Sequence, residues 1–532
     1  MPQMTGGQAL VAGMRQAGVT TLFGIPGVHN GGLYDALLDA PDMRVVITRH
    51  EQGAAFMADG YARASGRVAC VATITGPGIT NAATGLGEAY AESSPVLHIA
   101  TALGPASRTP EAGELHELRD QSGVLRALVG HHELVEKVPG IPGAVTRAMD
   151  AITTDRPGPA SVEIPLALLT ETADVELAEA GPATVAAPDS GAVDQAAALL
   201  ANAEAPLIFL GSGAMDAGSE VEALAERLQA PVLTAQTGKG AFPESHPLSL
   251  GCKHRLDESL YELLRTRDVA LVVGCRLGAR VTDDDRMPLP ETLIQVDRSA
   301  AELGRHRSNA VSIQADAAAA VSELLEALPD EPPPEAPDIA EGMRARRRSP
   351  HDAADDPRSA AILEELRRVL PDDGVLVNDM TMTSYRSAGL FPVDQPRSYM
   401  FPIYFGTLGF SLPAAIGAQV ACPERPVLSL SGDGGFLFTA EELATAVREQ
   451  LPVVAVVFND SSYAAIDGNF RGNFGGRTVD VRLHNPDFVA FGKSFGAAAE
   501  GVDTPEALGA AVERGLARRC PTLIEYRLPP VG

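Results

Sequence analysis

The sequence predicts an α/β protein made of three doubly wound parallel-sheet domains. At 532 residues the chain is too long for one hydrophobic core, and about 150 residues per domain gives three domains. Short apolar segments, of the kind that form buried parallel strands, alternate with helical patterns along most of the chain. The predicted domains cover residues 1–175, 188–328 and 358–532, and the proline-rich stretch 329–337 is typical of a stiff linker.

Composition and charge limit the class of partner. The chain has 42 basic and 69 acidic residues, a net charge of −27, which argues against nucleic acid or an anionic membrane as a partner. The five cysteines are scattered without a CxxC pair, so neither a disulfide framework nor a zinc site is predicted. No signal-like segment or apolar run of ~18 residues is present, so we expect a cytoplasmic protein. The basic run 344–348 is expected to be a linker or a helix face.

In the N-terminal domain, one acidic residue stands between a strand and a helix. A strand over 44–48 is followed by Arg49-His50-Glu51 and then by a helix over 52–64. Glu51 is therefore either a first-turn glutamate that interacts with the helix dipole or a functional group. We expect His50 to be structural.

Two further turns of this domain carry candidate residues. The loop 25–32 is rich in turn-forming residues and contains His29. A strand over 68–74 leads to Thr75-Gly76-Pro77-Gly78, and Asn81 is expected to open the next helix, because asparagine is favoured at helix caps.

The C-terminal domain contains a strand, loop, helix and strand unit over residues 431–461. Gly432-Asp433-Gly434-Gly435 interrupts an apolar strand, where small residues let a backbone approach a ligand. Thr439, followed three residues later by Glu442, has the spacing of a helix capping box. A continuous apolar run, typical of a buried parallel strand, then leads to Asn459.

Asp433 and Asn459 are expected at the same edge of the sheet. Strand, helix, strand units are right-handed, and both strands end on one side of the sheet. Carboxylate and amide oxygens suit Mg²⁺ or Ca²⁺, and Mg²⁺ often takes further ligands from phosphate groups. The amides of Gly434 and Gly435 are placed to meet such a phosphate. The unit therefore predicts a diphosphate held through a metal ion.

Two of these motifs resemble those of a known family. GDG followed 26 residues after its Asp by Asn-Asp, and RHEQGAAFMADGYAR at residues 49–63, resemble the cofactor motifs of thiamine diphosphate enzymes. Over essentially its whole length the chain is identified as a member of their acetolactate synthase-like superfamily. The resemblance implies an N-terminal pyrimidine-binding domain, a central domain and a C-terminal diphosphate-binding domain, with thiamine diphosphate and Mg²⁺ as cofactors.

The resemblance also implies roles for individual residues. Glu51 is similar to the glutamate that hydrogen-bonds the aminopyrimidine ring, and Leu408 to the apolar residue that bends the cofactor. The implied Mg²⁺ ligands are the side chains of Asp433 and Asn459 and the main-chain carbonyl of Ser461. The implied cofactor-binding set is Glu51, Pro77, Asn81, Thr381, Gly406, Leu408, Gly432, Asp433, Gly434, Gly435 and Asn459. The implied catalytic residues are Glu51, His29, His116 and Gln121.

The family contains several reactions, and the sequence favours one of them. The resemblance implies decarboxylation of a 2-oxo acid through a C2 carbanion and an enamine. The alternative is an acetolactate synthase-like or benzaldehyde lyase-like carboligase that forms 2-hydroxy ketones. Acetolactate synthases proper carry a tryptophan where this chain has Asn469, and the chain has no tryptophan at all. Retention of Glu51 argues against the glyoxylate carboligases. The segments 24–29 and 274–285 look most like relatives known as 5-guanidino-2-oxopentanoate decarboxylases.

Other features leave alternatives open. Gly211-Ser212-Gly213 and Asp297 resemble a dinucleotide site without its full spacing, so FAD is the less favoured alternative for the central domain. The glycine- and asparagine-rich run 468–476 is interpreted as a mobile lid, and Asp467 either pairs with a cationic substrate tail or is solvated. The partner expected is a small 2-oxo acid, with active sites between the subunits of a homodimer or homotetramer.

Overall fold

The computed structural model describes residues 1–104, 113–177, 185–253, 258–329 and 356–529. The predicted proline-rich linker beyond residue 329 and the basic run 344–348 lie outside these residues. The described chain forms three six-stranded parallel sheets with helices on their faces, which confirms the predicted fold class. No helix in the described ranges combines the length and the apolar character needed to span a membrane.

The N-terminal sheet has the strand order β3-β2-β4-β5-β7-β6. A short antiparallel pair, β1 and β8, lies beside it. The strands of this domain are β1 (Gln3–Thr5), β2 (Thr21–Gly24), β3 (Arg44–Ile47), β4 (Ala69–Thr73), β5 (Val96–Ala102), β6 (His131–Leu134), β7 (Pro159–Pro165) and β8 (Thr172–Asp174). Its helices are α1 (Gly6–Gln16), α2 (Gly31–Leu37), α3 (Glu51–Ser65), α4 (Pro77–Glu92), α5 (Gln121–Leu128) and α6 (Ile141–Thr153).

The central sheet has the order β11-β10-β9-β12-β13-β14. Its strands are β9 (Pro206–Leu210), β10 (Val232–Ala235), β11 (Ser249–Lys253), β12 (Val269–Val273), β13 (Thr292–Asp297) and β14 (Val311–Gln314). The helices around it are α7 (Ser190–Ala201), α8 (Gly218–Leu228), α9 (Glu258–Leu264), α10 (Ala279–Thr282) and α11 (Ala317–Ala327).

The C-terminal sheet has the order β16-β15-β17-β18-β20-β19. Its strands are β15 (Val375–Asn378), β16 (Tyr399–Met400), β17 (Val427–Gly432), β18 (Val454–Asn459), β19 (Ala498–Val502) and β20 (Thr522–Arg527). Its helices are α14 (Pro357–Val369), α15 (Met382–Leu390), α16 (Ser411–Ala421), α17 (Asp433–Phe436), α18 (Leu443–Arg448), α19 (Ala464–Asn473), α20 (Phe488–Ser494) and α21 (Pro505–Arg518).

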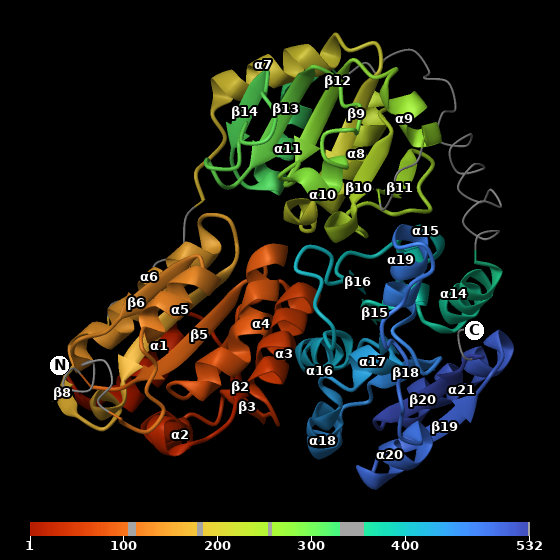
Figure 1. Cartoon of the computed structure of the whole chain (residues 1–532). Helices are drawn as coiled ribbons and strands as arrows, with labels where there is room; N and C mark the ends of the chain where they lie inside the picture. The colour runs from red at the N-terminus through yellow and green to blue at the C-terminus, as the bar shows by residue number, and fades with distance from the viewer. Residues whose placement is uncertain (105–112, 178–184, 254–257, 330–355, 530–532) are drawn as a thin grey trace.

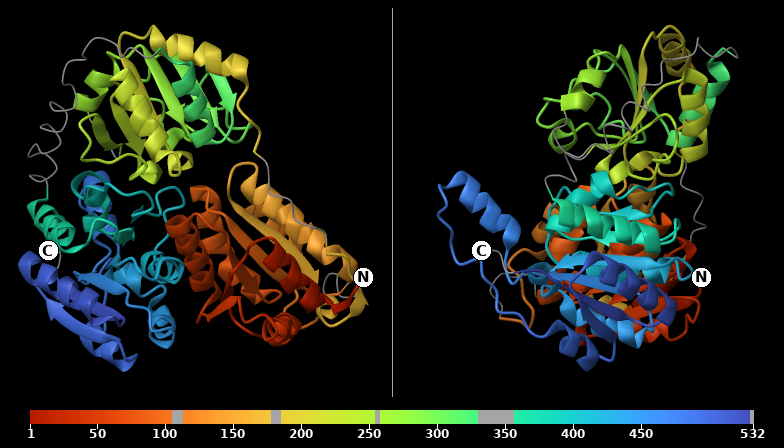
Figure 2. Two further views of the ribbon diagram at one scale, coloured as in Figure 1. Left: turned by 180° about the vertical axis from the view of Figure 1, so that it is seen from behind. Right: turned by 90° about the vertical axis from the view of Figure 1, so that its right-hand side faces the viewer.

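The N-terminal and C-terminal domains lie side by side, and the central domain sits across both of them (Figures 1 and 2). Helix α3 of the first packs against α16 of the last, and their apolar residues share one buried core. A Cβ atom at Gly60 would lie 2.0 Å from the carbonyl oxygen of Ala414, and one at Gly417 would lie 1.8 Å from that of Met57. Glycine at these positions therefore lets the two helices approach closely.

Three local expectations were wrong. Helix α4 begins at Pro77, so Asn81 stands in its second turn and not at its start. Thr439 and Glu442 make no capping box, because the Thr439 hydroxyl donates instead to the carbonyl of Gly409. Asp467 is not a solvated loop residue, since it lies buried in helix α19 and pairs with Arg471 at 2.7 Å.

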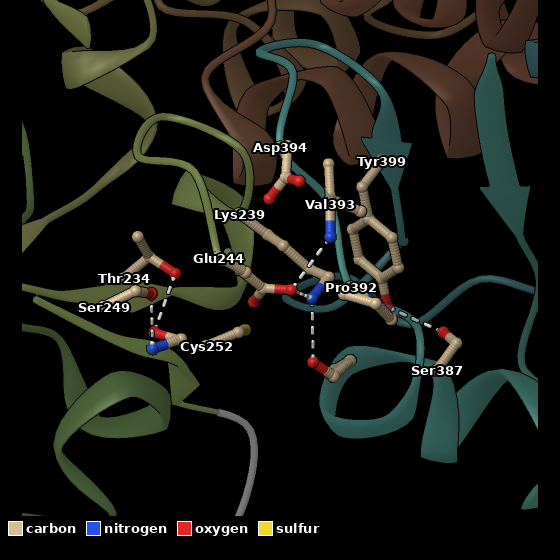
Figure 3. A network of polar contacts seen from close by, with 12 residues as sticks. Thr234, Lys239, Glu244, Ser249, Cys252, Ser387, Pro392, Val393, Asp394 and Tyr399 are labelled. Atoms are coloured by element: carbon tan, nitrogen blue, oxygen red, sulfur yellow. Dashed lines mark hydrogen bonds and ion pairs between the residues drawn. The ribbon is translucent and has the colours of Figure 1, made fainter. Parts of the chain in front are cut away.

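A buried ion pair of the central domain is hydrogen-bonded to the C-terminal domain (Figure 3). The ammonium nitrogen of Lys239, a residue that is 1% exposed, lies 2.6 Å from Glu244 Oε2 and donates to the carbonyl of Ala388 at 3.1 Å. The same glutamate oxygen accepts the amide of Val393 at 2.9 Å. The ring of Tyr399 lies 5.5 Å from the Lys239 nitrogen, where a cation is favoured. The charge is thus satisfied on all sides by groups from both domains.

Loss of this lysine is expected to weaken domain docking. Lys239→Met leaves Glu244 buried without its partner, and removing one member of a buried pair costs about 3–5 kcal/mol. Arg15→Met is the control, because Arg15 and Asp42 form a pair with 48% and 56% exposed side chains, and such pairs contribute about 0–1 kcal/mol. Urea unfolding followed by circular dichroism checks this. Equal unfolding midpoints for the two variants would contradict it.

Candidate active site

Two predicted ligands meet at the carboxyl edge of the C-terminal sheet. Strands β17 and β18 are parallel neighbours, and Gly432 pairs with Phe458, so Asp433 and Asn459 leave the sheet side by side. Their oxygens converge on the side-chain nitrogen of Asn485, which lies 2.6 Å from Asp433 Oδ2 and 2.9 Å from Asn459 Oδ1. Sequence reasoning missed Asn485, because a long connection after β18 carries it back and no local pattern marks it.

This cluster has the chemistry of a hard-cation site. The amide group of Asn485 carries a partial positive charge at the point where the two oxygens converge, and a metal ion is the stronger occupant of such a position. Burial raises the pKa of Asp433, while the hydrogen bonds from Asn485 and Gly434 lower it. Ser461 has a positive φ of 55°, and its carbonyl accepts the amide of Leu483 at 2.8 Å, which leaves one lone pair of that oxygen for another partner.

The residues predicted to lie near the diphosphate surround the start of α17. A Cβ atom at Gly434 would lie 2.5 Å from the ring of Tyr463, and one at Gly432 would lie 3.3 Å from the hydroxyl of Thr381. A Cβ atom at Gly435 would lie 3.6 Å from the side chain of Leu408. The loop residues Gly432, Gly434 and Gly435 therefore bring the predicted residues Thr381 and Leu408 up against the backbone. Gly406, with a positive φ of 72°, is exposed two residues before Leu408.

Glu51 occupies the start of α3 in the N-terminal domain. Its side chain is 9% exposed, and Oε2 accepts a hydrogen bond from Asn81 Nδ2 at 3.0 Å. A Cβ atom at Gly78 would lie 3.4 Å from Glu51 Oε1, so the turn that begins α4 with Pro77 closes over the carboxylate. His50 accepts the Gln52 amide through Nδ1 and caps the helix, the structural role expected of it.

The two candidate histidines lie in contact. The rings of His29 and His116 are edge to face, with centroids 4.8 Å apart and planes at 66°. Burial, and then the neighbouring His116, lower the pKa of His29. The Nδ1 atoms of both rings are buried and have no hydrogen-bond partner among the described residues. This pair brings two distant loops of the N-terminal domain together.

Gln121 supports the turn next to this pair. Its Oε1 accepts the amide of Gly76 at 3.0 Å, and its Nε2 donates to the carbonyl of Thr101 and to Glu163 Oε1 at 3.0 and 2.8 Å. A Cβ atom at Gly76 would lie 2.3 Å from the carbonyl oxygen of His116. Because both ends of the Gln121 amide are engaged within the domain, the side chain holds the Gly76 turn and the segment of His116 together.

A carboxylate from the C-terminal domain holds the backbone just before Glu51. The Glu442 side chain is fully buried and accepts the amides of Arg49 and His50 at 3.1 and 2.9 Å, together with the hydroxyl of Thr445 at 2.6 Å. A Cβ atom at Gly53 would lie 2.2 Å from its Oε1. Burial raises the pKa of Glu442 to about 7.

In the described ranges, no hydrogen bond or ion pair joins Glu51 or Asn81 to the Asp433, Asn459 and Asn485 cluster.

Family models match all three domains. The N-terminal TPP binding domain of thiamine pyrophosphate enzymes matches residues 4–124, the central domain 193–324 and the C-terminal TPP binding domain 379–526. The chain therefore belongs to the thiamine pyrophosphate enzyme family, and its cofactor is thiamine diphosphate. The resemblance inferred from the two motifs is confirmed.

Individual relatives cover nearly the whole chain. A "Probable 2-ketoarginine decarboxylase AruI" from Pseudomonas aeruginosa is 38% identical over 98% of this chain and 94% of its own length. A "Probable acetolactate synthase large subunit" from Methanocaldococcus jannaschii is 32% identical over 99% and 92%. The "Acetolactate synthase isozyme 1 large subunit" of Escherichia coli is 31% identical over 87% and 83%.

The dinucleotide-like loop of the central domain has a packing role. A Cβ atom at Gly211 would lie 2.1 Å from the carbonyl oxygen of Gly274, and one at Gly213 would lie 2.8 Å from its Cα. With Asp297 they border a cavity of about 250 Å³, below the ~300–1,000 Å³ of common ligand pockets. The glycines thus serve the close approach of two loops, and this geometry gives no support to FAD.

The pH dependence of stability tests the Glu442 contact. Its pKa is about 7 in the folded chain, against an ordinary value of 4.5. The folded chain therefore keeps a proton that the unfolded chain has lost between these values. The stability from this group is complete below about pH 4.5 and is lost as the pH rises through about 7.

Wild type should therefore lose stability relative to Glu442→Gln, which does not titrate there, by on the order of 3 kcal/mol between about pH 5 and pH 8. The free energy of unfolding of both proteins is measured at the two pH values. In the difference between the two proteins, the contributions of all other titrating groups cancel. A difference that stays constant with pH would contradict the burial of the Glu442 carboxyl group in this contact.

Proposed function

We propose that the chain is a thiamine diphosphate- and Mg²⁺-dependent decarboxylase of 2-oxo acids. The observation that carries this proposal is the presence of both predicted sets of cofactor-binding residues. One set is expected to bind the pyrimidine ring and the other to bind the metal ion and the diphosphate. One half offers a buried carboxylate, Glu51, that faces a turn and is held by Asn81. The other offers two convergent oxygens, of Asp433 and Asn459, at a sheet edge. The relative named as a 2-ketoarginine decarboxylase supports a decarboxylase among the activities of the family.

In this proposal, the metal-binding residues of the C-terminal domain hold the diphosphate of the cofactor. Asp433, Asn459 and the carbonyl of Ser461 would hold Mg²⁺, in the place that the Asn485 nitrogen takes between the two side-chain oxygens. The amides at the start of α17 then face the phosphate oxygens. The remaining residues assigned to the cofactor are Pro77, Asn81, Thr381, Gly406, Leu408, Gly432, Gly434 and Gly435.

In this proposal, residues of the N-terminal domain transfer the protons of the reaction. Glu51 would share a proton with the aminopyrimidine ring of the bound cofactor, while Asn81 holds the Glu51 carboxylate through its hydrogen bond. Bound thiamine diphosphate supplies a nucleophilic carbon and an electron sink for loss of CO₂. His29 and His116 donate a proton to the substrate carbon or its oxygen, since histidine gives and takes protons near neutral pH. Gln121 positions the turn between them and Glu51.

Carboligation is the second candidate. The acetolactate synthase relatives, at 29–32% identity, form carbon–carbon bonds as their names imply. The same proton donors decide between the two outcomes, because a donor held at the substrate carbon favours release of an aldehyde.

We also infer that a homodimer is the smallest active form. Exposed apolar side chains flank both halves. Val28 and Leu115, 94% and 67% exposed, are the chain neighbours of His29 and His116. Leu437 and Phe438, 39% and 49% exposed, follow the glycine loop. Clustered exposed apolar side chains mark interaction sites, and in this proposal a second copy that covers both would bring Glu51 of one chain to Asp433 of the other.

The reaction is tested with a panel of 2-oxo acids. CO₂ release should require both thiamine diphosphate and Mg²⁺, and a guanidino 2-oxo acid such as 2-ketoarginine is the first substrate to try. Each acid is offered with and without an aldehyde acceptor, and the products are identified by mass spectrometry. Consumption of 2-oxo acid only when an acceptor is present would contradict the decarboxylase and support the carboligase.

Asp433→Ala should abolish Mg²⁺-dependent binding of thiamine diphosphate, because half of the convergent side-chain oxygens is lost. Asp42→Ala, which removes an exposed carboxylate far from the site in sequence, serves as the control. Titration calorimetry with both ligands gives the affinities. Wild-type affinity in Asp433→Ala would rule out this metal site.

Glu51→Gln should bind the cofactor yet exchange its thiazolium C2 proton more slowly, by about 10²-fold or more. Glutamine keeps the size of the side chain and loses the ability to take up a proton. Exchange in deuterium oxide is followed by proton NMR, with Glu133→Gln, in an exposed pair with Arg147, as the control. Exchange at the wild-type rate would exclude Glu51 as the activating group.

A further inference from the structure

Asn459, one of the two side chains proposed to hold the metal ion, stands on the middle one of three neighbouring strands. Its strand β18 lies between β17, which Asp433 directly follows, and β20. An amide side chain has an oxygen at one end and a nitrogen at the other, and only the oxygen can bind a hard cation. The proposed site therefore depends on which end of the Asn459 amide is turned toward Asp433.

The oxygen end of this amide is surrounded by donors. Asn459 Oδ1 accepts hydrogen bonds from Asn485 Nδ2 at 2.9 Å and from the amide and the hydroxyl of Ser461 at 3.2 and 3.3 Å. The same Asn485 nitrogen donates to Asp433 Oδ2 at 2.6 Å, so this end of the amide faces the proposed position of the metal. A cation at that position needs the same oxygen of Asn459.

The nitrogen end of the amide is bonded to a carboxylate on β20. Asn459 Nδ2 donates to Glu525 Oε1 at 2.8 Å. Asn459 pairs with Arg527 across β18 and β20, so Glu525, two residues earlier, has its side chain on the same face of the sheet. Glu525 is 6% exposed, and its second oxygen, Oε2, accepts a hydrogen bond from Arg527 Nε at 3.0 Å. Both oxygens of this buried carboxylate are thus held in place.

The carboxylate of Glu525 selects one orientation of the amide. A carboxylate only accepts hydrogen bonds, whereas the oxygen and nitrogen of an asparagine amide exchange places by a half turn of the side chain. If the Asn459 amide turned over, its oxygen would meet Glu525 Oε1 and its nitrogen would meet the donors and the cation, and both contacts are repulsive. The observed orientation therefore offers an oxygen to the metal because Glu525 takes the nitrogen.

We propose that Glu525 is a positioning residue of the metal site, which acts on the Mg²⁺ through Asn459 without contacting the ion. The inference rests on the proposed function, because it takes Asp433 and Asn459 as metal ligands. The charge of Glu525 also polarises the amide toward its oxygen, which makes that oxygen a stronger ligand. Groups that orient metal ligands in this way change the metal affinity by about 10–100-fold when they are removed.

The test compares two side chains of nearly equal size. Glu525→Gln keeps an oxygen that can accept from Asn459 Nδ2, and Glu525→Met does not. Mg²⁺ is titrated into each protein at saturating thiamine diphosphate, and binding is followed by calorimetry. The Mg²⁺ concentration for half-maximal binding should rise about tenfold or more in Glu525→Met and less than about threefold in Glu525→Gln. Arg527→Met is the control and should change it less than about twofold, because the Arg527 side chain is 59% exposed and bonds the other oxygen of Glu525.

Urea unfolding of the metal-free proteins shows whether each variant folds. If Glu525→Met does not, Glu525→Thr takes its place with the same expectation, because threonine suits a strand and is too short to reach Asn459. The expected difference between the variants supports the inference even if no 2-oxo acid is decarboxylated, which would refute the proposed reaction alone. An unchanged Mg²⁺ requirement in Glu525→Met, an equal rise in Glu525→Gln, or binding of thiamine diphosphate to wild type that needs no Mg²⁺ would overturn the inference.

Discussion

A buried carboxylate ties the N-terminal domain to the C-terminal domain at the position where the candidate base stands. Glu442 follows the glycine loop of the proposed metal site by a few residues, and it accepts the amides of Arg49 and His50 directly before Glu51. Buried backbone amides need partners, and here the partner comes from a segment almost four hundred residues away in the chain. The direction in which α3 begins, and hence the position of Glu51, is set jointly by two domains. The close contact of α3 with α16, which Gly60 and Gly417 allow, fixes the same interface.

The sequence predicted those features that follow from local rules. The convergence of Asp433 and Asn459 follows from the geometry of neighbouring parallel strands, and Glu51 is recognisable from its place between a strand and a helix. Glu442 was misassigned because a local capping signature and a long-range contact use the same residue type at the same spacing. Asn485 could not be predicted, since only the folded path of a long connection brings it to Asp433 and Asn459. The contact between His29 and His116 likewise depends on two loops distant in sequence.

The arrangement separates the tasks of the protein. In the proposed function, one domain provides oxygens for a cation and amides for phosphate, and the other provides a buried carboxylate and two histidines for proton transfer. The exposed apolar residues beside each half supply a physical reason for two chains to combine.

Subunit complementation tests most directly whether the two halves of one site come from different chains. Glu51→Gln and Asp433→Ala proteins are each expected to be inactive, and they are mixed after mild dissociation and allowed to reassemble. If each site uses Glu51 of one chain and Asp433 of the other, every mixed dimer contains one intact site, and about a quarter of the wild-type activity should return, because half of randomly assorted dimers are mixed. No recovery of activity, in a mixture shown by mass spectrometry to contain mixed dimers, would contradict the shared site.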